Sequence, residues 1–413
     1  MANKIKSAAN QAQGIGSGAA APGIYVHVPF CAHACDFCAF YQIEPRRPDI
    51  DLYFDAIARE FALVAPGPGS ATAFWGGGTP GLLSARDLER LGRLQVDRFG
   101  VPTREWTVEL APGSVRPDKL RVLRDLGVTR VSLGIQSLNA RLLDALGRRH
   151  SQSQIQKAWE AILAAGFPSK NLDLIFAIPG QSLEDWRSDL DAAVAMEPDH
   201  ISTYCLTFEE DTALFVRLSA GKVSIDVERE RAFYEAGWDQ LEASGYLQYE
   251  ISNFARPGHA CLHNLNTWRM GEWWGFGPSA ASQAAGVRGS NPADLVAWSE
   301  IVRRGARATE DSLRLSKAQL AEDAVIFGLR MNEGISLELL EQRFGGPAID
   351  VFRPRLNDLI HAGLAEASGR ERIRLTRAGR LVADAIGAEF VGTVDEGCGG
   401  FQAVDNSVCR ISV

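Results

Sequence analysis

Three cysteines lie close together near the start of the chain, in the stretch YVHVPFCAHACDFCAF at residues 25–40. They are Cys31, Cys35 and Cys38, and Phe40 stands at the next position where a fourth thiol could follow. Cysteine thiolates bind zinc or the irons of an iron–sulfur cluster. A structural zinc site needs a fourth protein ligand, for which His33 is a candidate, although so tight a loop would have difficulty completing a tetrahedron. Three thiolates on a [4Fe–4S] cluster would instead leave one iron open to a small molecule.

The segment that positions these cysteines is the first of six predicted strands. The strands are short, rich in β-branched and aromatic residues and nearly unbroken in hydrophobicity, which is typical of strands covered on both faces. Helical patterns, such as those at residues 51–64 and 153–166, follow them. Six βα units in a row predict an α/β fold with a parallel sheet, open or closed into a barrel. The predicted strands are residues 24–28, 72–75, 106–110, 130–135, 171–176 and 200–206.

Polar groups recur where these strands end. The glycine run of WGGGTP, residues 75–80, follows the second strand, and backbone without side chains can approach a ligand closely. Glu109 and Gln136 end the third and fourth strands, and Asp173 lies inside the fifth. Parallel α/β folds bind ligands at the carboxyl ends of their strands, so we expect these groups to share one rim. A buried carboxylate needs a partner, for which Arg148 is a candidate, and purely structural ion pairs are the alternative.

The pattern of the sequence changes after the sixth strand. A Gly-, Pro- and Trp-rich stretch is less regular, and a mostly helical stretch with one short strand then predicts a small winged-helix-like domain. The predicted organisation is a flexible tail at 1–22, an α/β core at 23–245, an irregular region at 246–310, a C-terminal domain at 311–390 and a second flexible tail at 391–413.

Composition narrows the function classes. The chain has 413 residues and a net charge of -8, which argues against a general binder of nucleic acid or anionic membranes. Its seven cysteines, three of them in one loop, favour metal chemistry in a reducing compartment over a disulfide framework. No apolar run approaches the ~20 residues that span a bilayer, and the first 22 residues lack the apolar core of a signal peptide. We therefore expect a cytoplasmic protein.

The Cys-x3-Cys-x2-Cys loop resembles that of the radical S-adenosylmethionine (SAM) superfamily, in which SAM chelates the open iron of a [4Fe–4S] cluster. YVHVPFC, WGGGTP, GVTRVSLGIQSLNARLLDALGR and NLDLIFAIPGQ are similar to the branch that contains oxygen-independent coproporphyrinogen III oxidases and HemW haem chaperones. The resemblance runs from about residue 23 to 386. It implies a partial (βα)6 TIM-like barrel, a C-terminal domain like that of HemN, and a [4Fe–4S] cluster on Cys31, Cys35 and Cys38.

The same resemblance, carried over residue by residue, implies a SAM site at the strand ends. Aromatic side chains near the cluster and several polar groups suit an adenosine with a charged tail. The residues assigned in this way are Tyr25 and Phe37 beside the cluster, Gly77, Gly78 and Thr79 at the methionine end of SAM, and Glu109, Gln136, Arg148 and Asp173 around the rest of the ligand.

Two positions separate the branches of this family. The oxidases have a further cysteine two residues after the third, where this chain has Phe40, as the chaperones do. The chaperones also have a His-Asn-x-x-Tyr-Trp motif linked to haem binding, and this chain has HNLNTW at residues 263–268, with Thr267 in place of Tyr. The resemblance makes His263 a candidate haem ligand, for which we expect an accessible loop, and a hydrogen-bonded structural histidine is the alternative. Cys261 is the next candidate.

The resemblance therefore implies a haem chaperone that binds haem and delivers it to haem-dependent proteins, with the cluster and SAM serving regulation or assembly and a reductase or small electron donor as a partner. The alternative is an enzyme that uses a 5′-deoxyadenosyl radical from SAM for the oxidative decarboxylation of coproporphyrinogen III, or for another reaction on a porphyrin. A third hypothesis is DNA binding by the winged-helix-like domain. It is disfavoured, because acidic residues interrupt the arginines of that domain.

Overall fold

The computed structural model describes residues 21–396 apart from 66–68, 308–309 and 370–371. The predicted N-terminal tail lies almost entirely outside the described residues. Of the predicted C-terminal tail, only residues 391–396 are described, and they include the short helix α17 (Thr393–Glu396). The N–H groups of Gly392 and Val394 bond the carboxylate of Glu322 on α11, and the flexibility of the tail stays a prediction.

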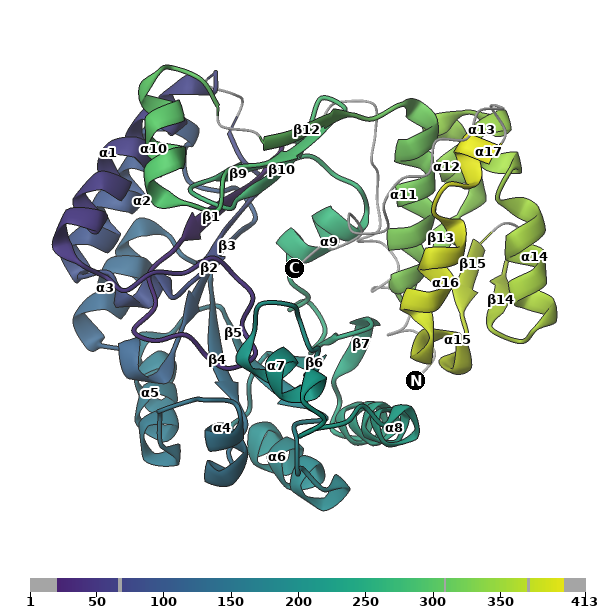
Figure 1. Ribbon diagram of the computed structural model, residues 1–413, viewed down its shortest axis with the longest axis horizontal. Helices are drawn as coiled ribbons and strands as arrows, with labels where there is room; N and C mark the ends of the chain where they lie inside the picture. Colours follow the sequence, from purple (N-terminus) through teal and green to yellow (C-terminus); the bar gives the residue numbers. More distant parts are fainter. Residues whose placement is uncertain (1–20, 66–68, 308–309, 370–371, 397–413) are drawn as a thin grey trace, which may run out of the picture.

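The first six strands are parallel and adjacent in chain order, as predicted. They form the curved half-barrel in Figure 1, and their registers are continuous except for one shift between the fourth and fifth strands. The strands are β1 (Gly23–Val28), β2 (Thr72–Gly77), β3 (Glu105–Leu110), β4 (Arg130–Gln136), β5 (Ser169–Phe176) and β6 (His200–Cys205).

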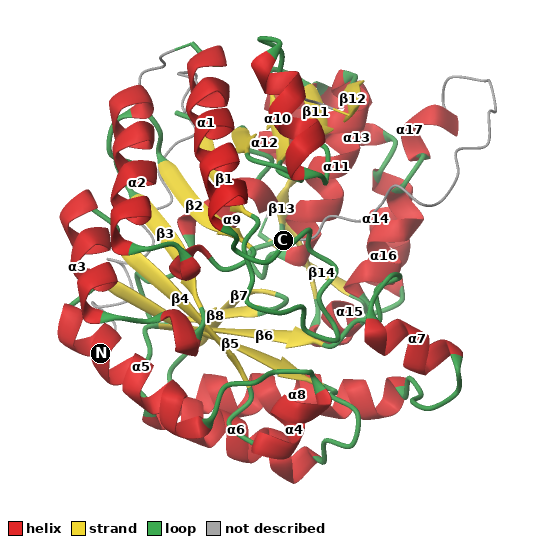
Figure 2. Cartoon of the chain, turned by 60° about the vertical axis from the view of Figure 1, so that its left-hand side comes forward, coloured by secondary structure: helices red, strands yellow, loops and turns green. Residues whose placement is uncertain are grey.

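Helices pack on the outside of this half-barrel (Figures 1 and 2). Local sequence signals determine where they begin and end. The hydroxyls of Ser151 and Ser182 cap two of them through capping boxes, and Gly166 ends one of them in a left-handed conformation with φ 69°. The helices of this part are α1 (Arg47–Leu63), α2 (Ala85–Phe99), α3 (Pro117–Leu126), α4 (Ala140–Ala145), α5 (Gln152–Ala165), α6 (Leu183–Ala195), α7 (Ala213–Ser219) and α8 (Val227–Ala243).

The two faces of the six strands differ in polarity. On the outer face, Trp75, Trp106 and Leu172 are fully buried against the helices. The inner face is mostly polar or small, so the expectation of strands that are apolar on both faces is wrong. It encloses a space that we call the lumen. The inner-facing residues of β2–β6 include Thr72, Phe74, Gly76, Glu105, Thr107, Glu109, Arg130, Ser132, Gly134, Asn171, Asp173, His200, Ser202 and Tyr204.

The region that we expected to be irregular forms regular structure at both edges of the half-barrel. One strand pairs parallel with β1 and another pairs antiparallel with β6, which extends the sheet to 12 strands. Sequence periodicity missed these strands because they are only three or four residues long. The elements are β7 (Leu247–Glu250), β8 (Asn253–Ala255), α9 (Leu262–Trp268), β9 (Trp273–Phe276), β10 (Ala281–Ala284), β11 (Val287–Ser290) and α10 (Leu295–Arg303), and β12 (Glu310–Arg314) follows.

The C-terminal domain has its own apolar core and closes the open side of the half-barrel, with α9 between the two (Figure 1). Its helices surround a three-stranded antiparallel sheet, as a winged-helix-like domain requires. Arg353, Arg374 and Arg377 of this domain form ion pairs with carboxylates. The elements are α11 (Lys317–Arg330), β13 (Ile335–Ser336), α12 (Leu337–Phe344), α13 (Gly346–Asp350), α14 (Arg353–His361), β14 (Ala365–Ser368), β15 (Arg372–Leu375), α15 (Arg377–Leu381) and α16 (Ala383–Phe390).

Candidate functional site

The cysteine loop crosses the carboxyl end of the half-barrel directly after β1. Three backbone hydrogen bonds fix it: Cys31 N–H to Ile43 O at 2.9 Å, Asp36 N–H to Leu146 O at 3.1 Å, and Leu214 N–H to Asp36 O at 2.9 Å. The loop is therefore attached to the end of α4 and to α7, and all three cysteines are partly exposed.

The glycine run packs against this loop rather than opening a simple turn. Gly78 N–H donates to Val28 O at 2.9 Å, and Thr79 N–H donates to Phe30 O at 2.8 Å. A Cβ on Gly78 would lie 2.7 Å from the Val28 carbonyl oxygen, so only glycine fits there. The N–H groups of these two residues are thus already used, and the Thr79 hydroxyl lies 3.4 Å from Cys31 Sγ.

Two carboxylates face each other across the upper lumen. Burial and then the nearby Asp173 carboxylate raise the pKa of Glu109 to about 8, although the Gly77 N–H opposes this shift. Asp173 accepts hydrogen bonds from Ser132 at 2.8 Å and from Asn171 at 2.7 Å. Neither carboxylate forms an ion pair within the described residues, so the expected pairing with Arg148 is wrong.

Arg148 and Gln136 also lie at the upper lumen. The Arg148 guanidinium carbon lies 5.7 Å from the centre of the Phe37 ring, and its Nε is buried without a hydrogen-bond partner. Gln136 has a left-handed backbone, with φ 64°, at the register shift between β4 and β5. Its side chain folds over Gly134, where a Cβ would lie 3.0 Å from the Gln136 Nε2 atom. A strained residue at a strand end is a common feature of binding sites.

Sequence reasoning missed the polar layer below these carboxylates. Asn171 Nδ2 donates to Ser132 and Ser202, and its Oδ1 contacts His200 Nδ1 at 2.6 Å. Tyr204 also faces this space, since burial, followed by the charges of Asp173 and others, raises its pKa well above the ordinary value. The signal for this layer is a polar residue at every second position of each strand. It is missed when only the average hydrophobicity of a strand is considered.

At the other end of the lumen, α9 carries the HNLNTW segment. Its first turn has no capping side chain of its own, and Glu105 of β3 takes that role. The Glu105 carboxylate accepts hydrogen bonds from Leu262 N–H and His263 N–H, each at 3.0 Å, and from Cys261 Sγ at 3.4 Å. Arg130, which donates to the His259 carbonyl oxygen, holds the preceding loop. We call this end, where the strands begin, the floor of the lumen.

His263 lies on the floor, and the expectation of an accessible loop is wrong. Its side chain is only 7% exposed, and its Nδ1 lies 3.0 Å from the hydroxyl of Thr72. The imidazole packs on the Phe74 ring at 5.4 Å between centroids. Burial lowers the pKa of His263 to about 4, so the imidazole is neutral at physiological pH. Its role as a haem ligand stays a prediction.

Comparison with known proteins identifies the family. Residues 25–193 match the Radical SAM superfamily, and residues 315–382 match the HemN C-terminal domain. The protein named heme chaperone HemW from Lactococcus lactis is 32% identical over 369 residues, which cover 89% of this chain and 96% of that protein. The protein of the same name from Mycobacterium tuberculosis is 35% identical over 380 residues, 90% of this chain and 95% of that one. The chain belongs to the HemW family.

The fold agrees with this assignment. The structure of HemN from Escherichia coli, described as a coproporphyrinogen III oxidase and a radical SAM enzyme, superposes with a TM-score of 0.79. The two chains are 25% identical, and the match covers 90% of each. The partial barrel and the C-terminal domain of this HemW-family chain thus have the same fold as those of HemN. No helix in the described part of the chain is both long and apolar enough to cross a bilayer.

The superfamily implies a [4Fe–4S] cluster, and the cysteine loop fits one. Burial raises the pKa of the Cys38 thiol to about 11, and the neighbouring Cys35 and Cys31 add to this shift, so the three thiols are close together. In the described residues, no three His, Cys, Asp or Glu side chains converge on a point where one metal ion could bind. Thiolates on a cubane bind three different irons, so they need not converge. Three neighbouring thiols in one loop suit the cluster, and the zinc site with His33 stays the alternative.

The superfamily also implies SAM, and the upper lumen fits a ligand with both charges. The unpaired carboxylates of Glu109 and Asp173 suit its sulfonium and ammonium groups, and the partnerless Nε of Arg148 suits its carboxylate. The N–H groups of Gly78 and Thr79 are occupied, and the Thr79 carbonyl oxygen accepts from Leu82 N–H at 2.9 Å, so these two residues have no backbone donor to offer a ligand. The glycine run therefore does not bind an anion through these two backbone N–H groups, as a typical glycine-rich anion site would.

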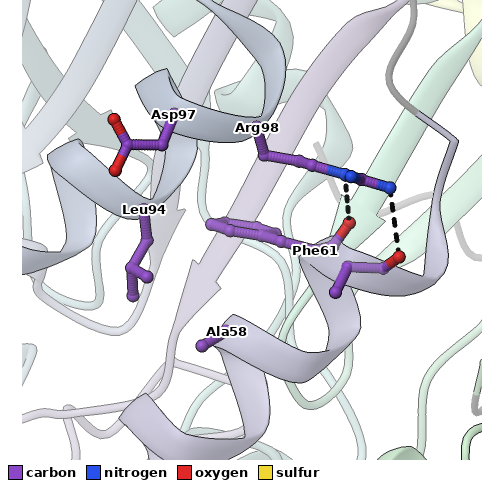
Figure 3. Close-up of a pocket in the computed structure, with 6 residues that line it drawn as sticks. Ala58, Phe61, Leu94, Asp97 and Arg98 are labelled. Atoms are coloured by element: carbon purple, nitrogen blue, oxygen red, sulfur yellow. Dashed lines mark hydrogen bonds between the residues drawn. The ribbon is translucent and has the colours of Figure 1, made fainter.

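Two hollows on the outer surface do not belong to this site. One, of about 490 Å³, lies among Arg47, Arg86, Asp87 and Arg90. The other, of about 150 Å³, lies between α1 and α2 and is shown in Figure 3. There Arg98 donates to the carbonyl oxygens of Phe61 and Ala62, each at 3.1 Å, which satisfies the free end of α1. The second hollow thus lies where Arg98 binds the last carbonyl groups of α1. None of the predicted site residues lines either hollow.

Proposed function

We propose that this HemW-family protein is a haem chaperone: it binds haem and passes it to a haem-dependent acceptor protein. The observation that carries the proposal is the similarity to proteins named heme chaperone HemW, which extends over both the barrel and the C-terminal domain. Haem is cargo in this proposal, whereas the cluster and SAM are resident cofactors. The acceptor is a protein that lacks its haem, and a reductase or small electron donor serves the cluster.

Cys31, Cys35 and Cys38 would hold the cluster, which would supply reducing equivalents for the chemistry of SAM. Tyr25 and Phe37 would flank SAM, and the carbonyl oxygens of Gly77 and Gly78 with the Thr79 hydroxyl would receive its ammonium group. Glu109 and Asp173 would balance its positive charges, since both lie unpaired in the upper lumen. Arg148 would bind the carboxylate, and Gln136 would hydrogen-bond the remaining polar edge of the ligand. The C-terminal domain and α9 would exclude water from the open side.

His263 would bind the haem iron through a neutral imidazole. The partner of its Nδ1 is Thr72, and no hydrogen bond to its Nε2 exists among the described residues. Because the residue is 7% exposed, haem access requires that the elements around the Nε2 edge of the ring move, while the Nδ1 contact to Thr72 stays. α9 is only seven residues long, and its other end packs on the C-terminal domain through Trp268 and Phe327.

The second candidate function is that of a coproporphyrinogen III oxidase, favoured by the extent of the structural match to HemN. Against it, Phe40 replaces the additional cysteine of the oxidases. The Phe40 side chain is 41% exposed, so it closes no core and is free to differ between branches.

Anaerobic incubation of the cluster-loaded protein separates these functions. In one arm, haem is added, and binding and transfer to a haem-free acceptor are followed by absorption. In the other, coproporphyrinogen III, SAM and a reductant are added, and porphyrin products are measured. The proposal expects haem binding and transfer with no decarboxylation. Turnover of coproporphyrinogen without haem binding would instead establish the oxidase.

A further inference from the structure

Three buried histidines line the lumen, and one of them differs from the others. His200 uses both ring nitrogens, with Asn171 at 2.6 Å on Nδ1 and Tyr249 at 2.9 Å on Nε2. His27 does the same, with the Tyr25 hydroxyl at 3.3 Å on Nδ1 and a backbone carbonyl at 3.0 Å on Nε2. A histidine with both nitrogens bonded is complete as a structural residue.

His263 is incomplete by the same measure. Its Nδ1 lies 3.0 Å from Thr72 Oγ1, whereas its Nε2 has no hydrogen-bond partner in the described part of the chain. This nitrogen is not among the buried side-chain atoms that lack a partner, so Nε2 is the edge of the ring that stays open to solvent or to a ligand. The remaining sides of the ring are fixed, because Phe74 packs on it and a Cβ on Gly23 would lie only 3.2 Å from its Cε1.

We propose that Thr72 is a positioning residue for haem, which accepts the Nδ1–H of His263 and so presents the Nε2 lone pair to the haem iron. This inference rests on the proposed function, since it assumes that His263 is the ligand. It adds that the amino end of β2 selects the tautomer and the orientation of the ligand ring. Thr72 itself touches neither haem nor the iron.

The chemistry of the two groups fits this role. A neutral imidazole has one proton, so a ring that binds iron through Nε2 must carry that proton on Nδ1. A hydroxyl oxygen has acceptor lone pairs and can take the Nδ1–H bond without any change of charge. Formation of the iron–nitrogen bond therefore requires no proton transfer to or from the pair. Partners of this kind on the far nitrogen typically change metal affinity 10–100-fold when removed.

The position of Thr72 is itself held by the floor. Thr72 faces Glu105 in the register of β2 and β3, and Glu105 bonds the N–H of His263. Thr72 of β2 therefore holds the His263 side chain, and its neighbour Glu105 of β3 holds the backbone of α9. This shared attachment predicts that the ring keeps its orientation when α9 moves little, and that loss of the Thr72 hydroxyl frees the ring to rotate.

The test is Thr72→Val, which keeps the shape of the side chain and removes the acceptor. We expect haem affinity to fall about 10–100-fold. We also expect the iron–histidine stretching band of the ferrous haem complex to move to lower frequency, because the ligand loses its Nδ1–H acceptor. Thr72→Ser, which keeps the hydroxyl, should restore both values. Thr72→Ala serves as a second deletion should the extra methyl group disturb the floor.

Thr107 supplies a matched control. It is a fully buried threonine on the inner face of the neighbouring strand, and its hydroxyl has no hydrogen-bond partner. Thr107→Val should leave haem affinity and the vibrational band unchanged. Equal affinity and an unchanged band in Thr72→Val, while His263→Ala loses haem, would overturn this inference and leave the proposed function standing. Haem binding that is unaffected in His263→Ala would overturn both the ligand and its positioning residue.

Discussion

The two ends of the lumen are built from the same strands but differ in how their charges are compensated. On the floor, Glu105 accepts three hydrogen bonds from the start of α9, and Arg130 lies nearby and holds the preceding loop. In the upper lumen, Glu109 and Asp173 have neutral hydrogen-bond donors but no ion pair among the described residues, and Asp173 raises the pKa of Glu109. The carboxylate on the floor thus fixes a helix, whereas the upper pair is left without a cation from the described part of the chain.

This difference distinguishes polar residues that hold the fold together from polar residues that are available to a ligand. The raised pKa of Glu109 shows that its charge is disfavoured in the empty upper lumen, and carboxyl groups perturbed in this way are common in ligand-binding sites. A satisfied carboxylate fixes a segment instead, here the HNLNTW segment with His263. The comparison predicts that mutations at the upper end change ligand binding, whereas mutations on the floor change stability and geometry.

The largest effect is expected at the cluster. Cys35→Ala should lose the cluster almost completely, because the remaining two thiolates hold only two of the four irons. Iron and sulfide analysis of anaerobically purified protein should give about four of each per chain for the wild type and close to none for the variant. Cys205→Ala, a half-buried cysteine outside the loop, is the control and should keep the cluster. Full retention in Cys35→Ala would remove this loop as the cluster site.

On the floor, Glu105→Ala should reduce the free energy of unfolding by about 1–3 kcal/mol, because it leaves three donors at the start of α9 without their acceptor. Glu109→Ala should cost about 1 kcal/mol or less, since it removes a carboxyl that accepts a single hydrogen bond, from the Gly77 N–H. Urea unfolding of cluster-free protein measures both. Equal losses in the two variants would mean that the two carboxylates do not differ as described.

SAM affinity should respond in the opposite order. Asp173→Ala should weaken SAM binding by about 1–3 kcal/mol, because a charged group of the ligand then lacks its partner. Glu105→Gln should leave SAM affinity near that of the wild type, since Glu105 lies at the other end of the lumen. Equilibrium dialysis on cluster-loaded protein gives both constants. Unchanged affinity in Asp173→Ala would make this carboxylate structural.

The smallest effect is a pH dependence. Burial and Asp173 raise the pKa of Glu109 from 4.5 to about 8, so between these values the folded protein keeps a proton that the unfolded chain has lost. Stability therefore falls as pH rises through this interval. Between pH 6 and 7, the wild type should lose about 1 kcal/mol relative to Glu109→Gln. Unfolding curves of the two proteins that keep a constant separation across this range would contradict the raised pKa.

The sequence was sufficient for the six parallel strands and for the cysteine loop, because local patterns encode both. Residues such as Asn171, Ser202 and Tyr204 were missed, since polarity at alternate positions shows only when the inner face is distinguished from the outer one. Two features depend on contacts between segments that are distant in the sequence. Arg148 lies over the Phe37 ring rather than in an ion pair with Glu109, and His263 is buried because α9 packs against β2. Short edge strands such as β9 carry too few residues for a periodic signal.

The central claim is that SAM and haem bind at opposite ends of one lumen, and a haem titration of three proteins tests it most directly. Haem is added anaerobically to the wild type, to Cys35→Ala and to His263→Ala, and the Soret band is followed. The account predicts about one haem per chain in the wild type and in Cys35→Ala, from the single ligand motif, and loss of the band or a large shift in His263→Ala. Loss of haem in Cys35→Ala with an unchanged band in His263→Ala would place haem at the cysteine loop and contradict the account.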